Sequence, residues 1–139
     1  MRTGQQVRTD IRSLPLVVIA IVISFVLLAF SSDALADRDW AIGSWRIQQN
    51  FSVHHEKTAF SGRLRIAREN GHFTGRIHFD TVGRWEELAD VHVSDDTIRF
   101  FRPEYPQEFH GMRKGRRIEG TWQDRARKNQ EWTWKAERD

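Results

Sequence analysis

The chain contains no cysteine. Disulfide bonds, thiolate nucleophiles, cysteine-based zinc sites and a lipid-modified N-terminal cysteine are therefore excluded. A domain of roughly 100 residues without disulfides must be stabilised by its hydrophobic core alone. The sequence supplies material for such a core, because its 139 residues include six tryptophans and nine phenylalanines. This aromatic content also argues against intrinsic disorder.

A strong excess of charge of one sign is missing as well. The formal net charge is only +3, from 22 Lys and Arg against 19 Asp and Glu. So small a net charge does not by itself indicate a nucleic-acid partner.

Long apolar runs are absent except near the N-terminus. Residues 14–30 carry no charge, follow a net basic start and precede Ala-Leu-Ala at 34–36. This order is typical of a secretory signal peptide cleaved after residue 36. An uncleaved membrane anchor is the alternative, because the run approaches the length needed to span a bilayer. Both interpretations predict residues 37–139 to be a domain in the periplasm or outside the cell, with membrane contact only through residues 14–30 if they are retained.

A repeated pattern around an Asn-Gly pair gives the strongest structural signal. In residues 60–66 and again in residues 73–79, Phe, Gly and aliphatic residues alternate with polar ones. Asn70-Gly71 lies between these segments, and Asn-Gly between alternating apolar residues is typical of a two-residue β-hairpin turn. The segment therefore predicts two antiparallel strands with one apolar and one charged face, too small to be stable alone.

The rest of the domain repeats this pattern of strand and turn, and no convincing helical period follows residue 36. A bulge is expected near Ala89, because Leu88 is out of step with the valines that follow it. Pro103 and Pro106 exclude a central strand between them. The sequence therefore predicts an all-β domain of about eight short strands. The expected strands are residues 45–51, 60–66, 73–79, 85–93, 97–102, 108–112, 117–123 and 131–137.

Four glycines fall on inward-facing strand positions: Gly62, Gly75, Gly111 and Gly120. Glycine weakens a strand interior unless the sheet bends there or another backbone comes close. A sheet that closes on itself needs such bends, and closure removes exposed edges. We therefore expect a single up-and-down antiparallel β-barrel, with a two-sheet sandwich of the same strands as the alternative.

Two short motifs and one basic residue resemble calycin-type barrels, the group of lipocalins and avidins. Gly-Ser-Trp at 43–45 is similar to the Gly-x-Trp that opens lipocalin barrels, and Gly-Thr-Trp at 120–122 is similar to the opening of avidin-type strands. In calycins a basic residue of the last strand packs over the tryptophan of the first strand, and Arg138 occupies that place. The resemblance implies a closed barrel base and suggests a lipocalin-like carrier of a small apolar ligand.

Inward-facing aromatic residues form the first candidate site. Their rings would either line a pocket for a flat apolar ligand or fill the barrel. A filled core is preferred, because each ring buries on the order of 150–250 Å² and so small a barrel has little room left. The candidate ligand-contacting residues are Trp45, Phe79, Phe100, Trp122, Trp132 and Trp134.

A basic hairpin tip forms the second candidate site. It comprises Arg113, Lys114, Arg116 and Arg117, which surround Gly115. Such a tip is suited to anionic lipid headgroups, an acidic polysaccharide or an acidic protein partner. A solvated tip with neighbouring carboxylates such as Glu119 as counter-charges is the simpler interpretation.

Residues suited to metal binding are few. His54 and His55 are adjacent, and adjacent side chains point to opposite sides of an extended chain. Because no third ligand is suitably spaced, a solvated loop is favoured and no metal site is predicted.

Two His–carboxylate pairs at strand spacing could serve proton transfer. His78 with Asp80, and Asp90 with His92, would share the outward face if their strands pair across residues 81–84. No nucleophile accompanies them, and pairing of charges on a wet face explains them as well. The sequence therefore predicts no enzyme and no cofactor.

These observations predict an exported, non-enzymatic binding or interaction module of the periplasm or cell envelope. Its partner would be an envelope or extracellular protein, and the alternative is the carrier of a small apolar ligand named above. Nucleic acid is not expected, since the aromatic residues face inward instead of forming a stacking platform.

Overall fold

The computed structural model describes residues 38–139. The signal peptide or anchor predicted in residues 1–36 lies outside that range. Within it, no helix is long and apolar enough to cross a membrane.

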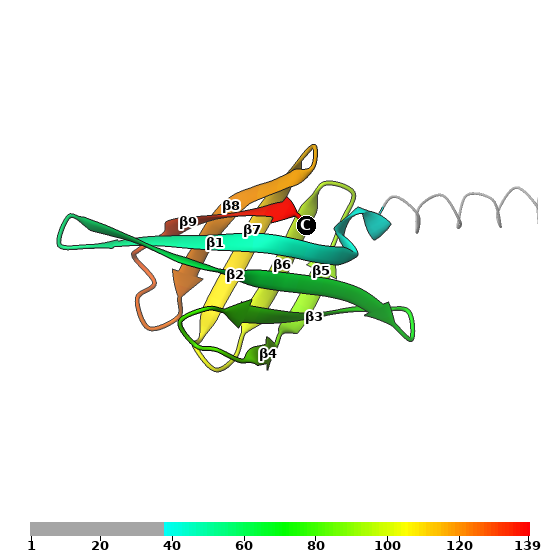
Figure 1. Cartoon of the computed structure of the whole chain (residues 1–139), viewed down its shortest axis with the longest axis horizontal. Helices are drawn as coiled ribbons and strands as arrows, with labels where there is room; N and C mark the ends of the chain where they lie inside the picture. The colour runs from blue at the N-terminus through cyan, green and yellow to red at the C-terminus, as the bar shows by residue number, and fades with distance from the viewer. Residues whose placement is uncertain (1–37) are drawn as a thin grey trace, which may run out of the picture. The chain divides into compact units, whose positions relative to one another are not determined.

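Nine antiparallel strands form one sheet that curves into a nearly closed barrel (Figure 1). The sheet order is β4-β3-β2-β1-β9-β8-β7-β6-β5. Every strand therefore has two hydrogen-bonded neighbours except β4 and β5, which are the two ends of the sheet. The elements are a 3-10 helix η1 (Asp39–Ala41) and the strands β1 (Gly43–Val53), β2 (Glu56–Glu69), β3 (His72–Phe79), β4 (Trp85–Glu87), β5 (Ala89–Val93), β6 (Thr97–Arg102), β7 (Gln107–Lys114), β8 (Arg117–Asp124) and β9 (Trp132–Arg138). The predicted all-β, antiparallel barrel is confirmed at this level.

The strand count is nine instead of about eight, because the segment expected as one strand at 85–93 is broken. β4 pairs with β3, β5 pairs with β6, and Leu88 between them donates its N–H to the Gly75 carbonyl oxygen at 2.9 Å. The register shifts between Ala89 and His92, and Asp90 has a φ of +51°, so the predicted bulge is present. Since β4 and β5 are the two ends of the sheet, this one bent segment brings both ends together.

The predicted hairpin around Asn70-Gly71 is confirmed. Glu69 pairs with His72, and the two turn residues have φ values of 51° and 79°, which is the left-handed backbone that a type I′ turn requires. The alternation of faces also holds, since the inward positions include the buried residues Leu64, Ile66, Ile77 and Phe79.

Close packing of an indole explains two of the inward glycines. Gly111 pairs with Gly120, and a Cβ on Gly111 would lie 2.6 Å from Cζ2 of Trp134. A Cβ on Gly120 would overlap the carbonyl oxygen of His110. The Trp134 Nε1–H group donates to the carbonyl oxygens of His110 at 3.0 Å and Thr121 at 3.1 Å. Glycine is therefore needed at these two positions because the Trp134 ring lies directly on the backbone, whether or not the sheet also bends there.

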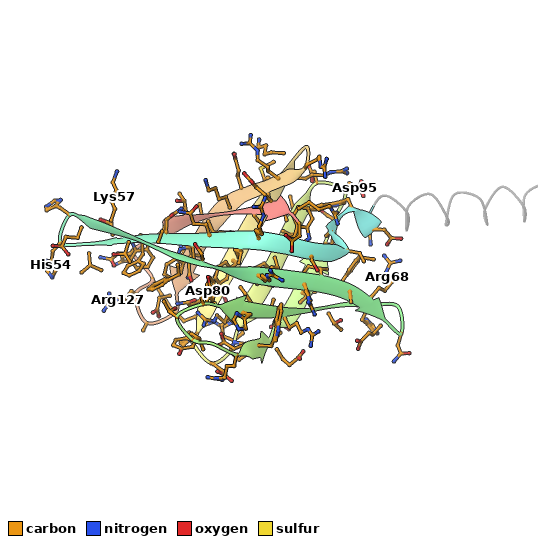
Figure 2. All side chains as sticks on the ribbon, viewed as in Figure 1. His54, Lys57, Arg68, Asp80, Asp95 and Arg127 are labelled. Carbon is orange, nitrogen blue, oxygen red and sulfur yellow. The ribbon has the colours of Figure 1, made fainter. Side chains whose placement is uncertain are left out.

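The two ends of the barrel differ in the elements that lie there. The base end carries η1 and the turns at 70–71, 94–96 and 115–116, and the open end carries the connections at 54–55, 80–84, 103–106 and 125–131. Figure 2 shows His54, Lys57 and Arg127 toward the open end, and Arg68 and Asp95 toward the base end.

Replacing Gly120 with alanine should lower the free energy of unfolding by about 3 kcal/mol or more, because the new methyl group has no space beside the β7 backbone. The neighbouring variant Glu119→Ala removes an exposed side chain and should change it by less than about 0.5 kcal/mol. Urea unfolding followed by tryptophan fluorescence measures both values. Equal stability of the two variants would refute the packing described for Trp134.

Candidate functional site

The base end is sealed by side chains. Trp45 donates its indole N–H to the Ala41 carbonyl oxygen at 2.9 Å, which holds η1 against β1. The Arg138 guanidinium lies 4.3 Å from the centroid of the Trp45 ring and donates to the carbonyl oxygens of Ile42 at 2.7 Å and of Trp40. The contact between Arg138 and Trp45 that the calycin resemblance implied is thus present. It holds the η1 segment over the base end of the barrel.

The middle of the barrel is packed with aromatic rings. Trp45, Phe100 and Trp134, three of the six candidate ligand residues, are each 1% exposed. Phe100 stacks on Phe109 with ring centroids 4.8 Å apart, and Trp134 meets both rings edge-on at 5.5 and 5.7 Å. These residues belong to the hydrophobic core.

A cavity of about 450 Å³ lies at the open end. The other three candidate residues, Phe79, Trp122 and Trp132, line this open-end pocket. Phe51, Val53, Phe60, Val82 and Tyr105 also contribute to its wall. Phe79 and Trp122 are also members of the buried core, so their rings form the floor of the pocket, whereas Trp132 is only partly buried.

Two stacked aromatic pairs shape the pocket wall. Trp122 and Trp132 stack with centroids 4.7 Å apart, and Phe51 and Phe60 stack at 5.0 Å. The Trp122 indole N–H donates to the Asn50 carbonyl oxygen at 2.8 Å. Because a backbone carbonyl already accepts the Trp122 N–H, the wall presents mainly apolar ring surface to a ligand.

A buried ion pair lies beside the pocket. Arg102 is 4% exposed and Glu86 is 2% exposed. Arg102 Nε donates to both carboxylate oxygens of Glu86 at 3.2 and 3.1 Å, and Nη2 donates to Oε2 at 2.5 Å. The guanidinium also lies 4.7 Å from the Phe79 ring centroid and 4.0 Å from that of Tyr105. Because Glu86 is in β4 and Arg102 in β6, the pair joins the two sides of the barrel where the sheet ends meet.

Two glutamines extend this ion pair into the pocket wall. Arg102 Nη1 donates to Gln107 Oε1 at 3.2 Å, and Gln49 Nε2 donates to the same oxygen at 3.1 Å. Both glutamines and Arg102 line the open-end pocket, although Gln49 is only 2% exposed. We call Glu86, Arg102, Gln107 and Gln49 the polar cluster. It supplies hydrogen-bonding groups within an otherwise aromatic site.

Sequence reasoning did not single out the polar cluster as a site. A signal for part of it was present, since Arg102 follows Ile98 and Phe100 at two-residue steps and therefore falls on the inward face. A charged residue at an inward position indicates a buried partner. No spacing identifies Glu86 as that partner, because the two strands are not paired with each other.

The two His–carboxylate pairs are not brought opposite each other. His78 pairs with Trp85 in β4, whereas His92 pairs with Arg99 in β6. The break at Leu88 directs the two halves of the segment to different neighbours, so the pairing considered from the sequence does not form. His78 Nδ1 lies 4.0 Å from Asp80 Oδ1 at the surface.

The remaining histidines considered above lie in a turn. His54 and His55 have φ values of 50° and 70° and form the exposed two-residue connection between β1 and β2. Across residues 38–139, no group of three or more His, Asp or Glu side chains is arranged to hold a metal ion.

The basic tip is at the base end, away from the pocket. Arg117 lies 3.8 Å from Glu119, an exposed pair that contributes little to stability. Arg113 lies over Trp40 with its Cζ atom 5.5 Å from the ring centroid. The tip and the open-end pocket are therefore separate surfaces.

Comparison of the sequence with protein-family models and with curated proteins finds no match. The function is therefore inferred from the geometry of the pocket and of the tip.

Replacing Arg102 with methionine should lower the free energy of unfolding by about 3–5 kcal/mol, because it leaves the Glu86 carboxylate buried without a partner. The double variant Glu86→Leu, Arg102→Met removes both charges and should recover most of this loss. A double-mutant cycle from urea unfolding gives the coupling energy. Strictly additive effects would show that the ion pair does not act as a unit.

Proposed function

We propose that this protein is an exported, non-enzymatic binding protein whose barrel takes up a small, flat, mainly apolar molecule at its open end. The cavity of about 450 Å³ carries the proposal. Ligand pockets of proteins commonly measure about 300–1,000 Å³ and combine apolar walls with a few polar groups. The stacked aromatic pairs and the polar cluster match that description.

The difference between the two ends of the barrel supports this function. The contacts of Arg138 and Trp45 block the base, so a ligand would enter and leave through the open end alone. This arrangement also supports grouping the chain with calycin-type barrels. Export follows from the signal pattern in residues 1–36, and it places binding in the periplasm or outside the cell.

The ionisable groups of the pocket favour binding over catalysis. Arg102 is held by Glu86 and by Gln107, so its guanidinium is not positioned as a free acid or electrophile. A catalytic site pairs a nucleophile or base with a group that orients it, and the pocket residues offer no such pair.

A pocket-filling variant tests the proposal. Thr81 is exposed at the pocket rim, and Thr81→Trp should occupy the cavity. The neutral fluorescent probe N-phenyl-1-naphthylamine should bind the original protein saturably and bind Thr81→Trp at least tenfold more weakly.

The matched control is Asp95→Trp, which adds an indole at the base end. Its affinity for the probe should equal that of the original protein. Equal loss in both variants, or no saturable binding to the original protein, would contradict a ligand pocket at the open end.

A second candidate function is binding of an anionic partner, such as an acidic envelope protein, by the basic tip. Among residues 38–139, no carboxylate oxygen lies within 4.0 Å of the charged nitrogens of Arg113, Lys114 or Arg116. Their charge is therefore available to a partner.

Charge reversal at the tip tests this second function. Lys114→Glu with Arg116→Glu should elute from a heparin column at lower salt than a control with the same change in net charge, Lys57→Glu with Arg127→Glu at the open end. Equal elution of the two variants would mean that only net charge matters and that the tip is not a distinct binding surface.

A further inference from the structure

We propose that the open-end pocket selects an uncharged, flat ligand with a hydrogen-bond acceptor beside a donor, as in a carboxamide or lactam. Gln107 and Gln49 bind these two groups. This inference rests on the proposed function, and it adds the chemical class of the ligand.

The charges of the pocket residues restrict the charge of the ligand. Arg102 is the most deeply buried cation at the pocket, and its charge is already compensated by Glu86 through hydrogen bonds from Nε and Nη2. The other charged lining residues, Asp124 and Arg127, have opposite signs and together add no net charge, and Arg127 is exposed to solvent. A buried ionic ligand would need a counter-charge that is not already compensated. The pocket therefore favours a neutral ligand.

The two amides are held in one orientation by their hydrogen-bond partners. Arginine has only donors, so the oxygen of Gln107, and not its nitrogen, must face Arg102. Gln49 then has to direct its Nε2 group toward that oxygen, which accepts both hydrogen bonds. Glu86 fixes Arg102, Arg102 fixes Gln107, and Gln107 fixes Gln49. The amide orientations follow from the ion pair alone.

One donor and one acceptor of the two amides are left for a ligand. The two lone pairs of Gln107 Oε1 are used, so Gln107 has its Nε2 donor free, and Gln49 has its Oε1 acceptor free. No residue in the described range 38–139 forms a hydrogen bond with either atom. Because the two amides are hydrogen-bonded to each other, this donor and acceptor belong to adjacent groups. A ligand carbonyl fits the donor, and a ligand N–H fits the acceptor.

The apolar walls set the shape of the rest of the ligand. The stacked pair of Trp122 and Trp132 presents a flat ring surface, and the Trp122 N–H is bound by Asn50. Flat rings stack favourably on such a surface. A planar ring system bearing one amide group therefore matches both the wall and the polar cluster.

Three probes that share one ring system test the inference. They are 2-naphthamide, with an acceptor and a donor, methyl 2-naphthoate, with acceptors only, and 2-naphthoate, which is an anion at neutral pH. Isothermal titration of the full chain in phosphatidylcholine nanodiscs measures each affinity, and Thr81→Trp in the same nanodiscs is the blank. We expect 2-naphthamide to bind at least tenfold more tightly than either of the other probes.

Two variants assign the preference to the glutamines. Gln107→Glu keeps an acceptor for Arg102 but offers the ligand no donor, and Gln49→Met removes the acceptor while leaving Gln107 bound to Arg102. Gln49→Met should abolish the tenfold preference for 2-naphthamide over methyl 2-naphthoate, because only the amide has an N–H for Gln49. Gln107→Glu should weaken the binding of both probes, because each presents a carbonyl oxygen to the Gln107 donor. Near-ultraviolet circular dichroism checks that each variant folds, and either folded variant alone suffices for the test.

The outcomes separate this inference from the proposed function. Saturable binding of all three probes with equal affinity would overturn the ligand class and leave the pocket standing. Tightest binding of 2-naphthoate would overturn it too, because Arg102 would then be acting as an anion site. If N-phenyl-1-naphthylamine and all three naphthalene probes behave as in the blank, the proposed function itself fails. An unchanged preference in folded Gln49→Met would refute the role given to Gln49, and unchanged affinities in folded Gln107→Glu would refute the role given to Gln107.

Discussion

The ion pair between Glu86 and Arg102 is the interaction from which the pocket takes its geometry. The end strands of the sheet belong to one bent segment, and this pair links β4 to β6 across the gap between them. Desolvating two charges is costly, so a buried pair is weak evidence for stability as such. Its geometric effect is clearer. It fixes a rigid guanidinium from which the amides of Gln107 and Gln49 take their orientation.

The base end is also held together by an arginine, but its partners differ from those of Arg102. There, too, an arginine lies on an aromatic ring, but Arg138 directs its donors to backbone carbonyl oxygens of the η1 segment and not to a carboxylate. Those hydrogen bonds satisfy backbone carbonyl oxygens that would otherwise lie unpaired above the core. One arginine therefore closes the barrel, whereas the other helps to line its opening.

The sequence predicted the strands, their faces and the Asn70-Gly71 turn because each depends on neighbouring residues. Period two and turn chemistry are local signals. It also predicted which aromatic residues face inward, but not that Trp134 packs in the core while Trp132 lines the pocket, since this depends on where along the barrel each ring lies. Glu86 could not be matched to Arg102, because the contact crosses a gap without strand pairing. The sequence predicted a bulge within residues 85–93, but not that they form two strands with different neighbours.

The order of the strands also bears on how the barrel folds. β1 to β4 and β5 to β9 are two series of hairpins, each joined by short connections, so nearly all pairings are between sequence neighbours. The exception is β1 with β9, where Trp45 pairs with Arg138 across almost the whole domain. Bringing these strands together carries the largest loss of chain entropy, which makes it the slow event in forming such a topology. The Trp45–Arg138 contact that seals the base would thus form last, after the hairpins that carry the open end, so the ligand entrance would take shape before the opposite end is closed.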